Sequence, residues 1–284
     1  MKVLLTGGKG MLGRTLVREL SEEFEIIPTD LPEADITDED SLDAVLGRYA
    51  PDVVIHCAAM TAVDRCETER DLAFRLNARG TANVAALCNR RGIRLIAIST
   101  DYVFDGDSYR PYNEFDHATG GRTVYGQSKF AGEEAVRTLC PNHVIARISW
   151  LYGAGGPSFV HAMMSLADGS RPALKVVADQ LGNPTSAAAV ARALKSILDR
   201  PNLCGTFHLT CEGEATWAEL AEVIFRLAGK SQKVHPCTTD EFPRPAPRPK
   251  NSRLDKMGLR LAGLPPMPDW KDALKEFMET EFAV

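Results

Sequence analysis

The sequence has no closely spaced cysteines. Seven cysteines are scattered over 284 residues without a Cys-x-x-Cys pair, and the six histidines show no His-x-x-x-His spacing. A disulfide framework needs denser cysteines and a structural zinc site needs paired ligands, so the spacing argues against both. We expect buried or idle thiols in a reducing compartment.

The sequence also lacks a surplus of positive charge and any long apolar run. It carries 33 basic and 38 acidic residues, a formal net charge of −5, so it has no electrostatic footprint for nucleic acid. No run approaches the ~18 apolar residues of a membrane span, and glycines and a lysine interrupt the N-terminal run too early for a secretory signal. We therefore expect a cytoplasmic protein that binds neither nucleic acid nor membrane.

The sequence has the composition of an ordinary globular protein, and its predicted strands alternate with predicted helices. It is 44% hydrophobic and 25% charged. Strands are predicted over 2–6, 24–29, 53–57, 94–99 and 143–150, and helices over 11–20, 41–48, 71–91 and 126–138. Alternation of this kind is typical of crossover units. The prediction is an α/β fold with a Rossmann-type, doubly wound parallel sheet.

The second half of the chain has a different pattern. Helices are predicted over 158–166, 187–199, 217–228 and 270–282, strands over 175–179 and 206–210, and a proline-rich stretch over 242–249. We expect a smaller, interleaved C-terminal substrate lobe. The predicted dinucleotide-binding domain is 1–150 plus about 186–210, and the substrate-binding lobe is 151–185 and 211–284.

A glycine-rich turn joins the first predicted strand to the first helix. Residues 6–13 read TGGKGMLG, with Gly7, Gly10 and Gly13 in a G-x-x-G-x-x-G spacing. Glycines let the backbone approach a pyrophosphate at a helix N-terminus, and Asp30 at the end of the second strand can bond ribose hydroxyls. The pattern indicates a dinucleotide site; a glycine-rich helix start without a ligand is the alternative.

Two further groups lie near predicted ligand positions. Tyr125 and Lys129 are four residues apart, so a helix would place the phenol and the ammonium on one face, where a positive charge lowers a tyrosine pKa. Thr100 and Asp101 end a predicted strand at the carboxyl edge of the sheet. Taken singly, each has a structural alternative, an exposed helical pair or strand-end capping.

Together these features resemble the extended short-chain dehydrogenase/reductase family, and within it the reductases of dTDP-linked 4-keto-6-deoxy sugars. The resemblance covers nearly the whole chain, from the first strand into the proline-rich tail. The matching stretches are TGGKGMLG (6–13), CAAMTAVDRCE (57–67), STDYVFDG (99–106), YGQSKFAGE (125–133), RISWLYG (147–153), DQLGNPT (179–185) and RPKNSRL (248–254).

The resemblance implies catalytic roles for three residues. Tyr125 would donate the proton, Thr100 would polarise the C4 carbonyl of the sugar, and Lys129 would bond the nicotinamide ribose and lower the pKa of Tyr125. On the substrate side, Asp101 and Trp150 match sugar-binding positions and Arg248 could meet the diphosphate. A core tryptophan and a solvated arginine are the alternatives for the last two.

The resemblance also implies a nicotinamide cofactor, NADPH or NADH. Asp30 would disfavour a 2′-phosphate, whereas Lys9 and Arg14 could compensate for it. The resemblance implies that the pyrophosphate lies at Gly7, Gly10, Met11 and Leu12, and that Asp30 bonds the adenosine ribose. Asp35 and Ile36 would flank the adenine. The nicotinamide half would lie beside Ala59, Met60 and Thr61, with Tyr125 and Lys129.

Some members of the family form metal-bridged dimers through glutamates that this chain lacks. Thr15 follows Arg14, and residues 186–189 supply no carboxylate. We therefore expect no metal, and a monomer or weak homodimer.

Two other functions remain open from the sequence. One is a non-catalytic, NADP-binding regulatory subunit, resembling the β subunit of methionine adenosyltransferase. The other is a related nucleotide-sugar reductase or epimerase. The complete set of Thr100, Tyr125 and Lys129 favours the reductase, whose partner would be a dTDP-sugar.

Overall fold

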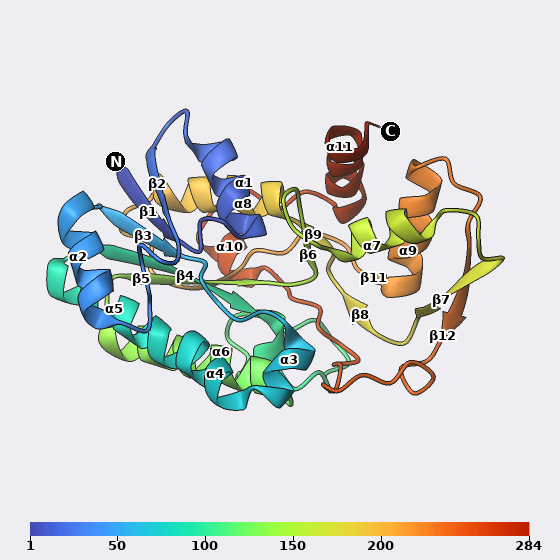
Figure 1. Cartoon of the computed structure of the whole chain (residues 1–284), viewed down its shortest axis with the longest axis horizontal. Coiled ribbons are helices and arrows are strands. Elements are labelled where there is room, and N and C mark those ends of the chain that lie inside the picture. The colour runs from blue at the N-terminus through green and yellow to red at the C-terminus, as the bar shows by residue number, and fades with distance from the viewer. Residues whose placement is uncertain (284) are drawn as a thin grey trace.

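The computed structural model describes residues 1–283, and its centre is a parallel sheet of six strands (Figure 1). Their order across the sheet is β10-β5-β4-β3-β1-β2. The bounds are β1 Lys2–Thr6, β2 Glu25–Thr29, β3 Val53–His56, β4 Arg94–Thr100, β5 His143–Ile148 and β10 Gly205–His208. The neighbours of β1 are β2 and β3, so the order of winding reverses at β1, as in a doubly wound fold.

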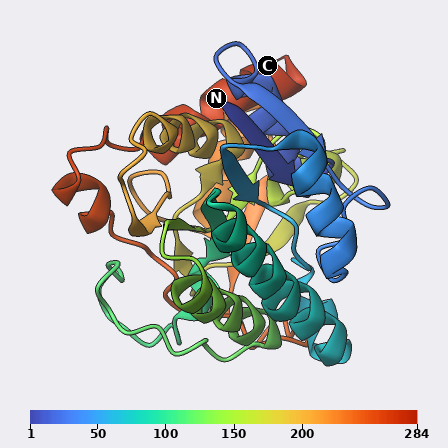
Figure 2. The same ribbon diagram turned by 90° about the vertical axis from the view of Figure 1, so that its left-hand side faces the viewer.

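Helices cover both faces of this sheet (Figure 2). One apolar cluster includes side chains of α1 and α8, and a second includes side chains of α2, α5 and α6. The bounds are α1 Met11–Leu20, α2 Glu39–Tyr49, α5 Thr81–Arg91, α6 Val124–Leu139 and α8 Ala187–Leu198. β3 and β4 are fully buried, since both their faces are covered. The predicted fold class is confirmed.

The prediction of one helix over 71–91 is wrong. The chain forms α3 (Val63–Thr68), α4 (Arg70–Phe74), a π-helical turn (Arg75–Gly80) and then α5. Within the turn, the Asn77 side chain hydrogen-bonds the backbone of Met60, and the Asn77 carbonyl accepts the Thr81 hydroxyl at 2.7 Å. The bonds from Asn77 to the Met60 loop, together with the local bond from Thr81, account for the departure from α-helical winding.

The second lobe consists of short strands and helices around α9 (Figure 1). Its elements are β6 Leu151–Tyr152, α7 Phe159–Leu166, β7 Ala173–Val177, β8 Leu181–Gly182, β9 Thr185–Ser186, β11 Ala215–Thr216, α9 Trp217–Leu227, β12 Lys233–Cys237 and α11 Trp270–Phe282. The short helix α10 (Met257–Leu261) instead lies against β10 of the central sheet. β7 overlaps the strand predicted over 175–179, and it pairs in parallel with β12, which was not predicted.

The two halves of the chain are interleaved. α8 packs on α1, and β10 adds to the edge of the sheet beside β5. A single apolar cluster runs from Val3 and Leu16 through α8 to Leu220 and Leu274. Because this core is continuous, it fixes the second lobe against the carboxyl edge of the sheet. No helix within residues 1–283 is long and apolar enough to cross a membrane.

Candidate active site

The carboxyl ends of β1, β3, β4 and β5 open into one cavity of about 690 Å³. Parallel strands end at the same edge, and ligands bind there beside the strand at which the order reverses. The cavity brings together most of the residues singled out from the sequence: Gly7, Gly10, Met11, Leu12, Ala59, Thr61, Thr100, Asp101, Tyr125, Lys129 and Trp150.

The glycine turn after β1 leaves no room for side chains. Gly7 has φ +69°, and a Cβ there would lie 2.7 Å from the Ala58 nitrogen. A Cβ on Gly13 would lie 2.5 Å from the Gly7 carbonyl oxygen. α1 begins at Met11 without a side-chain cap, so its first N–H groups are free to bind an anion. The turn therefore fits the pyrophosphate of a dinucleotide.

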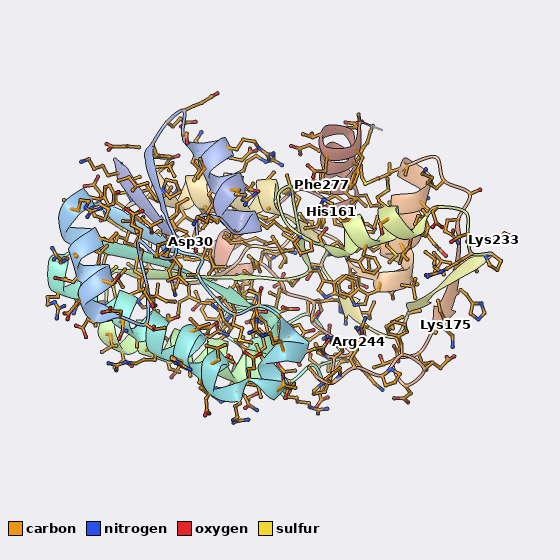
Figure 3. All side chains as sticks on the ribbon, viewed as in Figure 1. Asp30, His161, Lys175, Lys233, Arg244 and Phe277 are labelled. Atoms are coloured by element: carbon orange, nitrogen blue, oxygen red, sulfur yellow. The ribbon has the colours of Figure 1, made fainter. Side chains whose placement is uncertain are left out.

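Asp30 lies at the end of β2 and is fixed toward this turn. Its carboxylate accepts the Lys9 N–H at 3.0 Å and the Leu31 N–H at 2.8 Å. The Lys9 ammonium donates to the Leu31 carbonyl, and the Arg14 guanidinium donates to the Lys9 carbonyl. Both cations thus bond backbone carbonyls of Lys9 and Leu31, the residues whose N–H groups Asp30 accepts. Figure 3 shows Asp30 on the sheet, away from the second lobe.

Asp35 and Ile36 lie beyond the cavity. The Asp35 carboxylate accepts both the N–H and the hydroxyl of Thr37 at 2.8 Å. Ile36 is buried, and its carbonyl accepts the Asn83 amide. Their side chains shape the loop after β2 and do not line the cavity.

The loop after β3 is held by Asn77. The Asn77 amide accepts the Met60 N–H at 2.8 Å and donates to the Met60 carbonyl at 3.0 Å. The Met60 side chain is buried among Cys66, Ala73 and Val124 and does not line the cavity, whereas Ala59 and Thr61 do. Asn77 therefore fixes the loop that passes the cofactor position.

Thr100 and Asp101 follow β4 and form a hydrogen-bonded pair. The Thr100 hydroxyl donates to Asp101 Oδ1 at 2.8 Å, and Asp101 Oδ2 is buried without a hydrogen-bond partner in the described chain. Burial raises the pKa of Asp101 to about 7, and the hydrogen bond from Thr100 acts in the opposite direction. This carboxyl can consequently change protonation near neutral pH.

Tyr125 lies in the first turn of α6, where the Thr123 side chain caps the helix. Its ring packs edge-on against Tyr102, with centroids 5.6 Å apart. Burial raises the pKa of Tyr125 above its usual value, while the neighbouring Thr100 hydroxyl lowers it. The phenol is accordingly protonated at neutral pH, as a proton donor must be.

The Lys129 ammonium is directed at β4. It donates to the Ile98 carbonyl at 2.7 Å. Burial lowers the pKa of Lys129 itself to about 8, and Glu133 opposes this. That Lys129 lowers the pKa of Tyr125 stays a prediction.

A second, largely apolar cavity of about 550 Å³ lies in the second lobe. Trp150 and Arg248 line it, together with Phe159, Gln180 and Trp217. Arg248 forms an ion pair with Asp64 at 2.9 Å. The structure therefore places Trp150 at both cavities and Arg248 at the second one only.

The whole chain has relatives of known fold. Residues 1–282 match the family described as RmlD substrate binding domain. The chain belongs to this family.

Three relatives of this RmlD-family chain illustrate the likeness. It is 44% identical to a dTDP-4-dehydrorhamnose reductase from Clostridium acetobutylicum, with a TM-score of 0.95 over 99% of both chains. It is 41% identical to a dTDP-4-dehydrorhamnose reductase from Bacillus anthracis solved in complex with NADP, with a TM-score of 0.95 over 98% of this chain and 99% of that one. It is 42% identical to a probable dTDP-4,6-dihydroxy-2-methyloxan-3-one 4-ketoreductase from Streptomyces antibioticus, over 97% of this chain and 94% of the relative.

Several residues around the site of this RmlD-family chain were not predicted. Tyr102, Ser149 and Trp217 line the first cavity, and Asn77 holds its β3 loop. Tyr102 directly follows Asp101 in the STDYVFDG motif (99–106), so this motif could have indicated it. Trp217 had no such signal, since a tryptophan opening an amphipathic helix is typical of a core position.

No group of three or more His, Cys, Asp or Glu side chains in residues 1–283 is arranged to hold a metal ion. Thr15 is buried and donates its hydroxyl to the Met11 carbonyl, and Ser186 caps α8. That the protein uses no metal stays a prediction.

Proposed function

We propose that this protein reduces the C4 keto group of dTDP-4-dehydro-6-deoxy-L-mannose (dTDP-4-dehydrorhamnose) to dTDP-L-rhamnose with NADPH or NADH. The observation that carries the proposal is the convergence of Thr100, Tyr125 and Lys129 in the cavity that also contains the glycine turn. The named reductases among the relatives support the same substrate.

The residues present fit a dinucleotide. The turn at Gly7 and Gly13 would be filled by any Cβ, and α1 begins uncapped, so the pyrophosphate would lie at Gly10–Leu12. When bound, the nicotinamide supplies the hydride. Asp30 would bond the adenosine ribose, Asp35 and Ile36 would support the adenine side, and Ala59–Thr61 would flank the nicotinamide.

Both forms of the cofactor suit the site. Asp30 alone would repel a 2′-phosphate, but its carboxylate already accepts two N–H groups. Lys9 and Arg14 lie beside it as cations that could pair with the phosphate. The NADP complex of the Bacillus anthracis relative supports use of NADPH.

The chain's own part in the reaction is orientation and proton transfer. Thr100 would hold the carbonyl oxygen, and Tyr125, protonated at neutral pH, would give that oxygen its proton. Lys129 would bond the nicotinamide ribose once its ammonium turns from the Ile98 carbonyl. Asp101, with a pKa of about 7, would contact the sugar and control the direction of the Thr100 hydroxyl.

The second cavity would hold the nucleotide end of the substrate. Its walls are mostly apolar, with Arg171, Lys175, Arg244 and Arg248 around them. Figure 3 shows Lys175 and Arg244 on the second lobe, away from Asp30. Guanidinium groups suit a diphosphate, so Arg248 would exchange Asp64 for substrate oxygens.

The division into domains follows from this assignment. Residues 1–150 with about 186–210 would bind the dinucleotide, and 151–185 with 211–284 would bind the sugar nucleotide. We propose a monomer or weak homodimer without nucleic-acid or membrane partners. All seven cysteines are free, which supports a cytoplasmic location.

The test is an assay of purified protein alone. The keto-sugar is generated from dTDP-glucose by its dehydratase and epimerase, and NADPH or NADH oxidation is followed. We expect oxidation that depends on the keto-sugar and yields dTDP-L-rhamnose. Oxidation without release of that product would favour a related nucleotide-sugar reductase, and no oxidation with tight NADP binding would favour the regulatory subunit.

A further inference from the structure

Two tryptophans separate the cofactor cavity from the apolar cavity. Trp150, Trp217 and Tyr102 are the residues that line both. A sugar nucleotide with C4 near Tyr125 and its nucleotide in the second cavity must pass this boundary. The boundary side chains therefore decide how the hexose enters.

The two indoles are stacked face to face. Their centroids lie 3.5 Å apart and their planes are inclined by 7°. Trp150 follows β5 of the sheet, whereas Trp217 is the first residue of α9 in the second lobe. The face of Trp150 that could pack against a sugar ring is thus covered by Trp217.

Trp150 is the fixed half of the stack. Its Nε1 donates to the Ser252 hydroxyl at 3.1 Å, and a Cβ on Gly182 would lie 2.3 Å from its ring. Its backbone has φ +46°, an unusual value for a bulky residue that surrounding contacts must maintain.

Apart from Trp150, the side chains that contact Trp217 belong to the second lobe. Its Nε1 donates to the Gln180 side chain at 3.0 Å, and its ring contacts that of Phe159 at a 51° inclination, with centroids 4.7 Å apart. Its backbone is held by the capping box of Thr216 and Glu219. Rotation of the indole about its side-chain torsions would therefore leave these backbone bonds of α9 in place.

We propose that Trp217 is a gate, which leaves the face of Trp150 when the hexose enters and is replaced there by the sugar ring. The proposal rests on the reductase function. The nucleotide alone fills the second cavity without crossing the boundary, so only the attached sugar displaces the indole. The apolar face of a 6-deoxyhexose then packs on the face of Trp150 that Trp217 has left.

The direct test is the contact between the two rings in solution. Protonated tryptophan is incorporated into the full-length deuterated protein, and ring-to-ring nuclear Overhauser effects are recorded with NADPH bound. Signals are assigned with Trp150→Phe and Trp217→Phe, while Trp270, which stacks on neither ring, is the internal control. We expect the Trp150–Trp217 effect with NADPH alone and with dTDP, and its loss with dTDP-L-rhamnose.

The alternatives give distinct results. Persistence of the effect in a dTDP-L-rhamnose complex that is saturated by calorimetry overturns the gate and leaves the reductase intact. Loss with dTDP alone also overturns it. Failure of dTDP-L-rhamnose to bind, with no keto-sugar reduction, overturns the proposed function and the gate with it.

Association kinetics distinguish a gate from a rigid wall. In Trp217→Leu the smaller side chain cannot cover Trp150. A minor open state is populated at about 0.1–10% in the wild type, and association through it is slowed by that fraction. Stopped-flow association of dTDP-L-rhamnose to the variant should therefore accelerate at least about tenfold. A rigid wall would leave association unchanged and accelerate dissociation, which would contradict the gate. Trp270→Phe should retain the original association rate.

Discussion

At the residue scale, the chemistry depends on a chain of three side chains, Asp101, Thr100 and Tyr125. Asp101 accepts the Thr100 hydroxyl, and Thr100 is near enough to the phenol to affect its pKa. The sequence predicted these residues because they end a strand or share a helix face. It could not predict that Lys129 would face the Ile98 carbonyl, because that depends on packing of α6 against β4.

Substitution of the proposed proton donor should separate catalysis from cofactor binding. Tyr125→Phe removes the hydroxyl and keeps the ring that packs on Tyr102. We expect kcat to fall by roughly 10²–10⁴, the range for acid–base catalysis, with NADPH affinity maintained. Steady-state kinetics and a fluorescence titration of NADPH measure the two. Unchanged kcat would contradict the role of Tyr125.

The pH profile should report on Asp101. Above the Asp101 pKa of about 7, the ionised carboxylate accepts the hydrogen bond of the Thr100 hydroxyl, so that hydroxyl cannot donate to the substrate carbonyl. We expect kcat to decrease as pH rises through about 7 in the wild type. Asp101→Asn removes this ionisation and should remove that limb of the profile. Retention of the same limb in the variant would assign it to another group.

At the element scale, the π-helical turn shows where sequence reasoning ends. The apolar spacing over 71–91 indicated one continuous helix, and α4 and α5 do occupy much of that range. The departure at Arg75–Gly80 depends on Asn77 bonding a loop 17 residues earlier. Nothing local in the sequence records such a tertiary contact. Short strands such as β8 and β11 were missed for the same reason.

The same turn gives a stability prediction. Asn77→Ala would leave the buried Met60 N–H and carbonyl without the bonds they make to the side chain. We expect a loss of about 1–3 kcal/mol in the free energy of unfolding, measured by urea denaturation. Asn83→Ala is the matched control, since Asn83 makes one such bond, to the Ile36 carbonyl, and should cost less. Equal losses would contradict a special role for the turn.

At the scale of the whole molecule, the alternation of strands and helices was sufficient to predict the doubly wound sheet. The return of the chain to the sheet at β10 was predicted as well, as a strand over 206–210. The arrangement of the second lobe was predicted only in outline, because its two-stranded sheets pair residues far apart in sequence, such as β7 with β12. The stacking of Trp150 on Trp217 depends on that arrangement.

Two buried histidines should make global stability depend on pH. Burial lowers the pKa of His56 and of His208 to about 3, from a usual value of 6.5. Since the unfolded chain binds protons at higher pH, their contribution is complete above about 6.5 and is lost as pH falls toward 3. From pH 7 to 5 each should reduce the free energy of unfolding by roughly 2 kcal/mol. Burial also raises the pKa of Asp101 to about 7, which favours the folded state as pH falls and offsets part of this loss. The contribution of one histidine is therefore measured as the difference between the wild type and its variant, in denaturant titrations at pH 7, 6 and 5.

The matched variant is His56→Gln, which retains groups that can bond the Thr6 and Thr81 hydroxyls. Its free energy of unfolding should fall by roughly 2 kcal/mol less than that of the wild type between pH 7 and 5. A slope equal to that of the wild type would show that the imidazole of His56 takes up protons in the folded state.

The roles assigned to Thr100, Tyr125 and Lys129 all depend on transfer of hydride to C4 of the sugar. The most direct measurement is a single turnover with NADPH carrying deuterium at C4 of the nicotinamide, on the face that the enzyme uses. Mass spectrometry and proton NMR then locate the label in the product. We predict one deuterium at C4 of dTDP-L-rhamnose. Product without deuterium from either labelled face, or label at another carbon, would show that hydride is not transferred to C4.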